Sequence, residues 1–168
     1  MNITRVSVDS AGNQANQGPS VSSYPSISSD GRFVVFGSPA SNLVPGDTNA
    51  SSDVFVRDTL ANTTTRVSVD SAGNQGNNLS TEPSISANGR FVTFWSNATN
   101  LVPGDTNNTN DIFVRDSLTD TTTRVSVDSA GNQGNKYSGN PSISADGRFV
   151  AFHSRATNLV SCSTSKLH

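Results

Sequence analysis

Apolar residues along the chain gather in short runs, separated by stretches rich in Ser, Thr, Asn, Asp and Gly. No stretch shows the spacing of an amphipathic helix, and the runs are typical of β-strands. One such series predicts four successive strands, over residues 25–28, 32–36, 53–57 and 63–69. An Asp-Gly or Asn-Gly pair follows the first strand, at residues 30–31, 88–89 and 146–147. Such a pair supplies the positive φ angles of a tight hairpin turn.

The whole pattern is repeated. The segment Thr-Arg-Val-Ser-Val-Asp-Ser-Ala-Gly-Asn-Gln occurs at residues 4–14, 65–75 and 123–133, and Pro-Ser-Ile-Ser begins at residues 25, 83 and 141. A fixed period of this size indicates one supersecondary unit that is copied along the chain. Such units bury their apolar faces against neighbouring copies.

The second strand of each unit is apolar at consecutive positions, as in Phe91-Val-Thr-Phe-Trp95. This pattern is typical of a strand that is buried on both faces. Antiparallel sheets with two buried faces must stack, and radial stacking into a β-propeller also limits their exposed edges. A parallel β-helix is disfavoured by the long period and the hairpin turns. A two-sheet sandwich remains an alternative, although it gives no reason for a sustained repeat.

The motif Pro-Ser-Ile-Ser-x-Asp-Gly-Arg-Phe-Val-x-Phe, followed by Asp-Ile-Phe-Val-Arg-Asp and Thr-Thr-Thr-Arg-Val-Ser, resembles the TolB-type ("PD") β-propeller repeat. The resemblance covers nearly the whole chain. It implies an all-β fold with blades of four antiparallel strands, often six to a propeller. It also implies an exported or periplasmic bacterial protein that serves as a binding scaffold or lies beside a separate catalytic unit. The family motif supplies no active site.

The strands of a blade are lettered A to D from the centre outwards. The sequence then predicts a partial propeller over residues 1–160, made of a D strand (4–8), blade one (25–69), blade two (83–127) and an incomplete blade three (141–160). Residues 161–168 match no earlier repeat and are interpreted as an ending foreign to the array. Incomplete blades would expose apolar sheet faces. We therefore expect a head-to-tail homodimer, in which three blade-equivalents per chain close a six-bladed ring.

Composition excludes several classes of protein. Only 32% of residues are apolar, but their grouping and a net charge of −2 argue against disorder. The basic residues are spread through the repeats, so no nucleic-acid partner is expected, and the arginines are expected to pair with aspartates at strand ends.

No apolar segment is long enough to span a bilayer, and residues 1–30 lack a signal-peptide pattern. Cys162 is the single cysteine, which excludes an intramolecular disulfide.

The loop between strands B and C places oxygen-bearing side chains at alternating positions around a glycine. This spacing resembles that of calcium-binding loops and predicts a weak Ca²⁺ site. The candidate ligands are Asp47, Asn49 and Asp53 in blade one, and Asp105, Asn107 and Asp111 in blade two. In the alternative, which we favour, the same residues cap turns by hydrogen bonds to the backbone.

The sequence offers little for catalysis. His153 lies on the third B strand beside Ser154, but no Gly-x-Ser-x-Gly motif occurs and no acid is placed to orient the imidazole. The leading hypothesis is therefore a non-catalytic module for scaffolding or recognition. Loop 70–77, rich in amides and glycine, offers hydrogen bonds to a protein or carbohydrate ligand. The alternative is a hydrolase that uses His153 and a nearby serine at the channel or at an oligomer interface.

Overall fold

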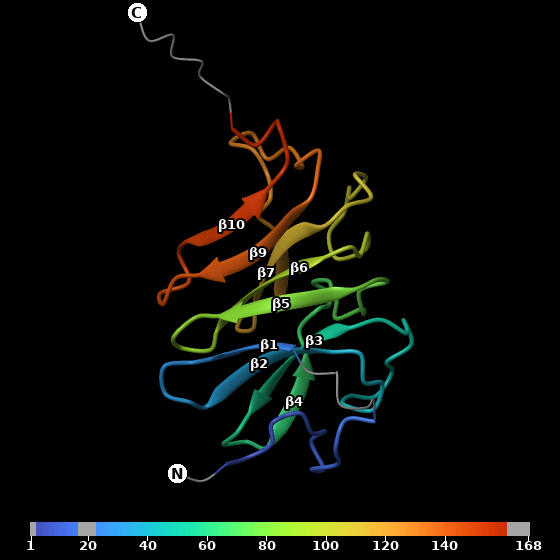
Figure 1. Ribbon diagram of the computed structural model, residues 1–168, viewed down its shortest axis with the longest axis vertical. Coiled ribbons are helices and arrows are strands. Elements are labelled where there is room, and N and C mark those ends of the chain that lie inside the picture. The colour runs from blue at the N-terminus through green and yellow to red at the C-terminus, as the bar shows by residue number, and fades with distance from the viewer. Residues whose placement is uncertain (1–2, 17–22, 161–168) are drawn as a thin grey trace, which may run out of the picture.

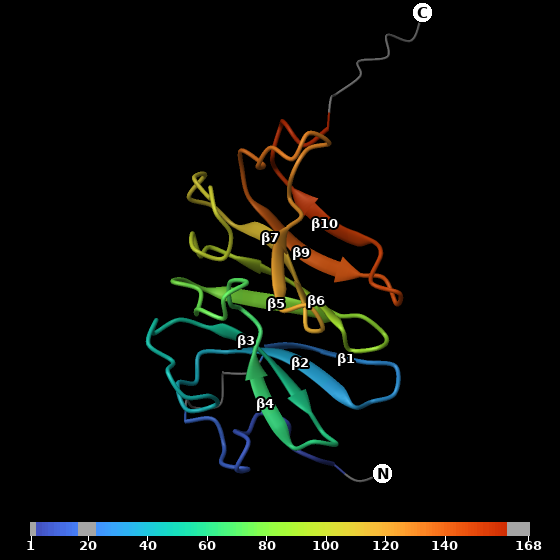
Figure 2. The ribbon, with the colours of Figure 1, turned by 180° about the vertical axis from the view of Figure 1, so that it is seen from behind.

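A computed structural model describes residues 3–16 and 23–160, which form ten strands and no helix. The strands are β1 (Ser23–Ile27), β2 (Phe33–Ser38), β3 (Asp53–Asp58), β4 (Thr63–Arg66), β5 (Ser80–Ile85), β6 (Phe91–Ser96), β7 (Asp111–Asp116), β8 (Thr121–Arg124), β9 (Ser138–Ile143) and β10 (Val150–Ser154). They make three antiparallel sheets in the orders β1-β2-β3-β4, β5-β6-β7-β8 and β9-β10. Figures 1 and 2 show these sheets, called blades one, two and three below, stacked in chain order.

Each A–B hairpin forms where the sequence predicts it, but its turn differs in detail. Gly31, Gly89 and Gly147 have φ angles of 74° to 75°, whereas the Asp or Asn before each glycine does not have a positive φ. The turn is therefore not the two-residue type that the dipeptide suggests. Its loop is closed by a hydrogen bond from Ser28 N to Phe33 O (2.9 Å) and by the Asp30 carboxylate, which accepts one from Ser28 Oγ (2.6 Å).

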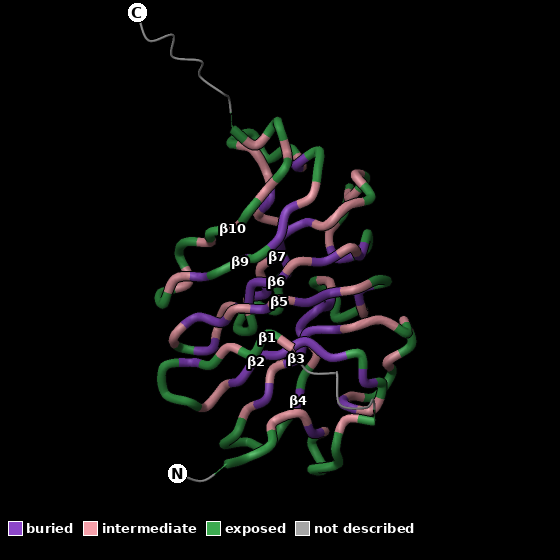
Figure 3. Tube along the Cα trace, in the orientation of Figure 1, coloured by how far each residue is buried: buried purple, intermediate pink, exposed green. Residues whose placement is uncertain are grey.

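The B strands of the two complete blades, β2 and β6, are buried on both faces, as their sequence predicts, whereas β10 has no buried residue. Val34, Val35 and Phe36 on β2 are all at most 9% exposed. The Val35 side of β2 packs against blade two in a core that includes Phe94 and Phe113, whereas Phe36 stacks on Phe55 in a separate cluster. Figure 3 shows the buried residues concentrated where the blades meet. One face of β2 is thus buried by stacking on blade two, and the other by the B–C loop and the segment that contains Val6 and Ala15.

Neighbouring blades are joined by a contact that recurs. The ring of Phe33 packs so closely over Gly89 that a Cβ on this glycine would lie 2.2 Å from it, and Phe91 packs in the same way over Gly147. Backbone hydrogen bonds accompany both contacts, from Ser29 N to Ala87 O and from Ala87 N to Ala145 O (both 2.9 Å). This arrangement of a ring over a glycine is called the blade joint below.

Residues 4–8, the predicted D strand, form no strand in this single chain, and their pairing in the expected homodimer stays a prediction. Val8 forms only an isolated bridge with Gln14, because the C strand that would pair with residues 4–8 would have to come from a preceding blade. The segment instead packs on blade one, where Thr64 Oγ1 donates to Val8 O (2.6 Å). Strands β4 and β8 also end earlier than predicted, at Arg66 and Arg124. The foreign ending predicted over residues 161–168 lies outside the described residues.

Among the described residues, no helix is long and apolar enough to cross a membrane.

Candidate functional sites in the repeated grooves

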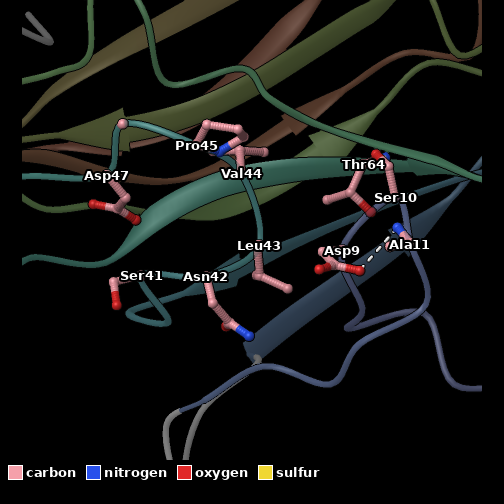
Figure 4. A pocket seen from close by; sticks show the side chains of 11 residues that line it. Asp9, Ser10, Ala11, Ser41, Asn42, Leu43, Val44, Pro45, Asp47 and Thr64 are labelled. Carbon is pink, nitrogen blue, oxygen red and sulfur yellow. Dashed lines mark hydrogen bonds between the residues drawn. The ribbon is translucent and has the colours of Figure 1, made fainter.

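An open groove lies beside each complete blade, between two loops that are distant in sequence. The first has a volume of about 460 Å³. One wall is the loop at Asp9, Ser10 and Ala11, and the other is the B–C loop over residues 41–47 (Figure 4). The second groove, of about 570 Å³, is lined by residues 70–72, 99–106 and 122, which are the matching positions of the repeat.

The loop between strand D of one unit and strand A of the next, called the D–A loop below, forms one wall of each groove and is held in shape by an aspartate. In the second groove, Asp70 Oδ1 accepts hydrogen bonds from Ala72 N (2.9 Å) and Asn74 N (2.8 Å). Burial acts to raise the pKa of Asp70, but the hydrogen bonds from Asn74 and the loop amides outweigh it and lower the pKa. The equivalent Asp9 also has a lowered pKa, chiefly through the Asn13 side chain. Each groove therefore carries an ionised carboxylate at neutral pH.

An asparagine ties the two walls together. Asn100 Oδ1 accepts a hydrogen bond from Asn77 N (2.8 Å), and Asn100 Nδ2 donates to Gln75 O (2.8 Å). Asn42 makes the same two bonds with residues 16 and 14 in the first groove. Since these side chains bridge successive units of the repeat, the groove is preformed in the folded chain.

The predicted calcium ligands do come together, but around an arginine. Arg66 Nε lies 3.2 Å from Asp53 Oδ2, and Arg66 Nη2 lies 3.5 Å from Asp47 Oδ2. Gln75 Nε2 donates to both carboxylates, at 2.9 Å to Asp47 and 2.7 Å to Asp53, and Ser68 Oγ donates to Asp53 at 2.7 Å. Burial raises the pKa of Asp53 despite the donors around it. A guanidinium thus supplies the positive charge at the place where the loop would need a cation.

The amide of the predicted ligand set has a structural role. Asn49 Nδ2 donates to Gly76 O (2.9 Å), and Asn49 Oδ1 accepts from Ser51 N (2.9 Å). Blade two repeats the arrangement with Asp105, Asn107 and Asp111, in which Arg124 Nη1 lies 3.4 Å from Asp105 Oδ1. No group of three or more His, Cys, Asp or Glu side chains arranged for a metal occurs in the described part of the chain. This geometry supports the turn-capping alternative, and Ca²⁺ binding stays a prediction.

Sequence reasoning anticipated Arg–Asp pairing, but it did not identify which arginines would be buried. Arg32 and Arg90 do pair with Asp58 and Asp116 at the blade surface. The side chain of Arg66, in contrast, is only 8% exposed. A signal existed, because Arg66 and Gln75 recur as Arg124 and Gln133 with the same period as the aspartates that they contact.

The elements of the hydrolase hypothesis are not assembled into a catalytic site. His153 is exposed on β10, and its ring lies 6.0 Å from that of Tyr137. Ser154 Oγ accepts hydrogen bonds from Ser138 Oγ (2.9 Å) and Ala156 N (3.0 Å), so its hydroxyl is engaged in the structure. No carboxylate hydrogen-bonds to His153 among the described residues.

No family model matches the sequence, and no curated protein is similar to it. Among solved structures, the chain is similar to TolB from Acinetobacter baumannii, with a TM-score of 0.53 and 19% identity over 82% of this chain and 28% of that one. It is also similar to a protein from Agrobacterium tumefaciens described as TolB, with a TM-score of 0.51 and 20% identity over 82% and 39% of the two chains. The chain therefore spans well under half of the TolB structures that it matches.

The likeness to these structures confirms the predicted fold: the described residues are all-β, with two four-stranded antiparallel blades and a two-stranded sheet arranged as in the TolB-type β-propeller. At this level of identity the likeness concerns the fold alone.

Proposed function

We propose that this chain is a non-catalytic β-propeller module that binds a protein ligand through its repeated grooves and acts as a scaffold. The observation that carries the proposal is the recurrence of one groove, with the same lining positions, in blades one and two. The groove recurs because its lining residues are part of the sequence repeat, so one chain presents the same binding surface twice. A repeated groove suits a ligand that is itself extended.

The chemistry of the groove favours a polypeptide. Val44 and Pro45 offer apolar surface on one wall, and Asp9 offers an ionised carboxylate on the other. Carboxylates of this kind form the stronger, charge-assisted hydrogen bonds with Lys and Arg side chains. Neither groove has an aromatic side chain in its lining on which a sugar ring would stack. We therefore favour a peptide segment with basic side chains over a carbohydrate.

The binding proposal is tested by selecting a displayed peptide library on the chain and counter-selecting on a variant with filled grooves. Ala11 and Ala72 are exposed lining residues, so the double change Ala11→Arg and Ala72→Arg narrows both grooves without disturbing the core. Ala61→Arg, at an exposed turn outside the grooves, is the matched control. We expect enriched, basic peptides that bind the wild type and the control, but bind the double variant at least tenfold more weakly. Equal binding to all three proteins would contradict the proposal.

Absence of catalysis is tested separately with chromogenic ester, glycoside and peptide substrates. We expect no turnover above that of a buffer blank. Turnover by the wild type that is lost in His153→Ala would replace this proposal by the hydrolase alternative.

Self-assembly is the second part of the proposed scaffold role. Apolar side chains are exposed at both ends of the stack, with Ile27 59% and Phe149 65% exposed. Since exposed apolar sheet faces drive association, we expect the chain to form a closed head-to-tail dimer with six blade-equivalents. Light scattering coupled to size-exclusion chromatography should give twice the chain mass of 17.5 kDa. A clean monomer would exclude self-assembly.

A further inference from the structure

The two ends of the stack carry opposite halves of the blade joint. At the blade-one end, Gly31 is in the position of Gly89 and Gly147, but a Cβ placed on it would meet only the tip of Ile27, at 4.0 Å. At the blade-three end, Phe149 is in the position of Phe33 and Phe91, but this residue is 65% exposed. One end therefore offers an open glycine and the other offers a free ring.

A second pair of positions shows the same complementarity. Ile85 and Ile143, which lie on A strands that pack against the preceding blade, are 6% and 9% exposed. Ile27, at the same position of blade one, is 59% exposed. The backbone amides of the two buried isoleucines donate to a serine of the preceding blade, Ile85 N to Ser26 Oγ and Ile143 N to Ser84 Oγ (both 3.3 Å). The equivalent serine at the far end of the stack is Ser142.

We propose that a second copy of this chain occupies each end, and that Phe149 of one copy packs over Gly31 of the other in a joint that repeats the two internal ones. This proposal rests on the self-assembly proposed above and names the residues that carry it. The two surfaces fit each other because Gly31 and Phe149 are further copies of the glycine and the phenylalanine that form the internal joints.

The internal joints also fix the register of the proposed contact. Ser29 N donates to Ala87 O, and Ala87 N donates to Ala145 O. Continuing this series by one blade places Ala145 N of one copy against Ser29 O of the other, and Ile27 N against Ser142 Oγ. Both Ser29 and Ala145 are exposed in the single chain. The contact is heterologous, because each copy contributes a different end, and two such contacts are needed to close a ring.

The register is tested by disulfide cross-linking. In a Cys162→Ser background, which removes the native cysteine, Ser29→Cys and Ala145→Cys are made as separate single variants. The two proteins are mixed in reduced form, allowed to exchange subunits and then oxidised. Ser29→Cys with Ala87→Cys in one chain is the internal control, since those residues form the equivalent contact inside the chain. We expect a covalent dimer from the mixture and little from either single variant alone.

The aromatic contact is tested by Phe149→Ala, which we expect to weaken dimerisation at least tenfold by sedimentation. Leu118→Ala is the control, because Leu118 is 71% exposed in a turn outside the joint and its change should leave the dimer intact.

The possible outcomes separate the two proposals. A monomeric wild type overturns both. A dimer that persists in Phe149→Ala and gives no mixed cross-link overturns the proposed joint and leaves self-assembly in place. Cross-linking of Ser29→Cys to itself or of Ala145→Cys to itself would indicate a symmetric interface and would also overturn the joint.

Discussion

The buried charge cluster beside each groove gives a quantitative prediction. Replacing Arg66 by Met keeps much of the apolar stem but removes the guanidinium. Two carboxylates then remain with no positive partner, those of Asp47 and Asp53, whose side chains are 3% and 0% exposed. The change therefore leaves two buried negative charges unpaired, which costs more than the loss of an ion pair at the surface.

The size of the effect follows from the geometry. At an effective dielectric constant of 20, an ion pair at these separations has a gross attraction of about 5 kcal/mol, which desolvation partly offsets. Removing one partner of a buried pair typically costs about 3–5 kcal/mol. The Arg66 contacts of 3.2 and 3.5 Å are longer than those of the strongest charge-assisted bonds, and Gln75 and Ser68 remain as donors. We therefore expect Arg66→Met to lower the free energy of unfolding by about 3 kcal/mol at pH 7.5.

The pH dependence of this loss is part of the prediction. Burial already raises the pKa of Asp53, and Arg66 is one of the groups that lower it, so its removal should raise the pKa further. A carboxyl whose pKa is raised on folding favours the folded state more as the pH falls through that pKa. The deficit of Arg66→Met should therefore shrink between pH 7.5 and pH 5.

Urea denaturation followed by the fluorescence of Trp95, the single tryptophan, measures both quantities. Arg5→Met is the matched control, because Arg5 has the same position in the repeat but is exposed. We expect its change to stay within about 0.5 kcal/mol. A loss below about 1 kcal/mol in Arg66→Met, or a deficit that does not change with pH, would show that Arg66 does not stabilise the two buried carboxylates.

Three further predictions concern the turns, the surface pairs and calcium. Gly89→Ala should lower the free energy of unfolding by more than about 2 kcal/mol, because its Cβ would clash with the ring at the blade joint and its φ is positive. Gly104→Ala has open space around it and should lower that free energy by about 1 kcal/mol, so equal losses in urea denaturation would contradict the joint. The hydrogen bond and charge of the neighbouring arginine lower the pKa of Asp58 to about 2 and also lower that of Asp116. The stability that the two ionised carboxylates contribute is therefore present above pH 3.8 and is lost as the pH falls towards 2. Changing both residues to Asn should flatten the acid limb of a curve of unfolding free energy against pH, and an unchanged limb would contradict this prediction. Finally, EDTA and Ca²⁺ should leave the melting temperature unchanged, because a guanidinium already lies between the two carboxylates where a cation would bind. A calcium-dependent rise would support the calcium prediction instead.

For the candidate groove, the sequence was sufficient to identify the two loops that line it but not to predict that they lie side by side. Both walls of the groove were singled out from the sequence, as loop 70–77 and as the B–C loop. Their meeting was not predicted, because the D–A loop of one unit packs on the following blade, as in the contact of Thr122 with Val69 O and Ser71 Oγ. Contacts between repeats depend on the rotation from blade to blade, which sequence spacing does not specify.

Residues that are close in the sequence specify the repeating unit: four strands, their order, the A–B hairpins and the burial of strand B on both faces in the complete blades. These features follow from local turn chemistry and from apolar periodicity, which are properties of neighbouring residues. Which charges are buried and which segments pair depends instead on contacts between residues that are distant in the sequence. Arg66 lies between two aspartates because strand D and the B–C loop converge in space, and residues 4–8 form no strand because a ladder requires a neighbour that this chain does not place beside them.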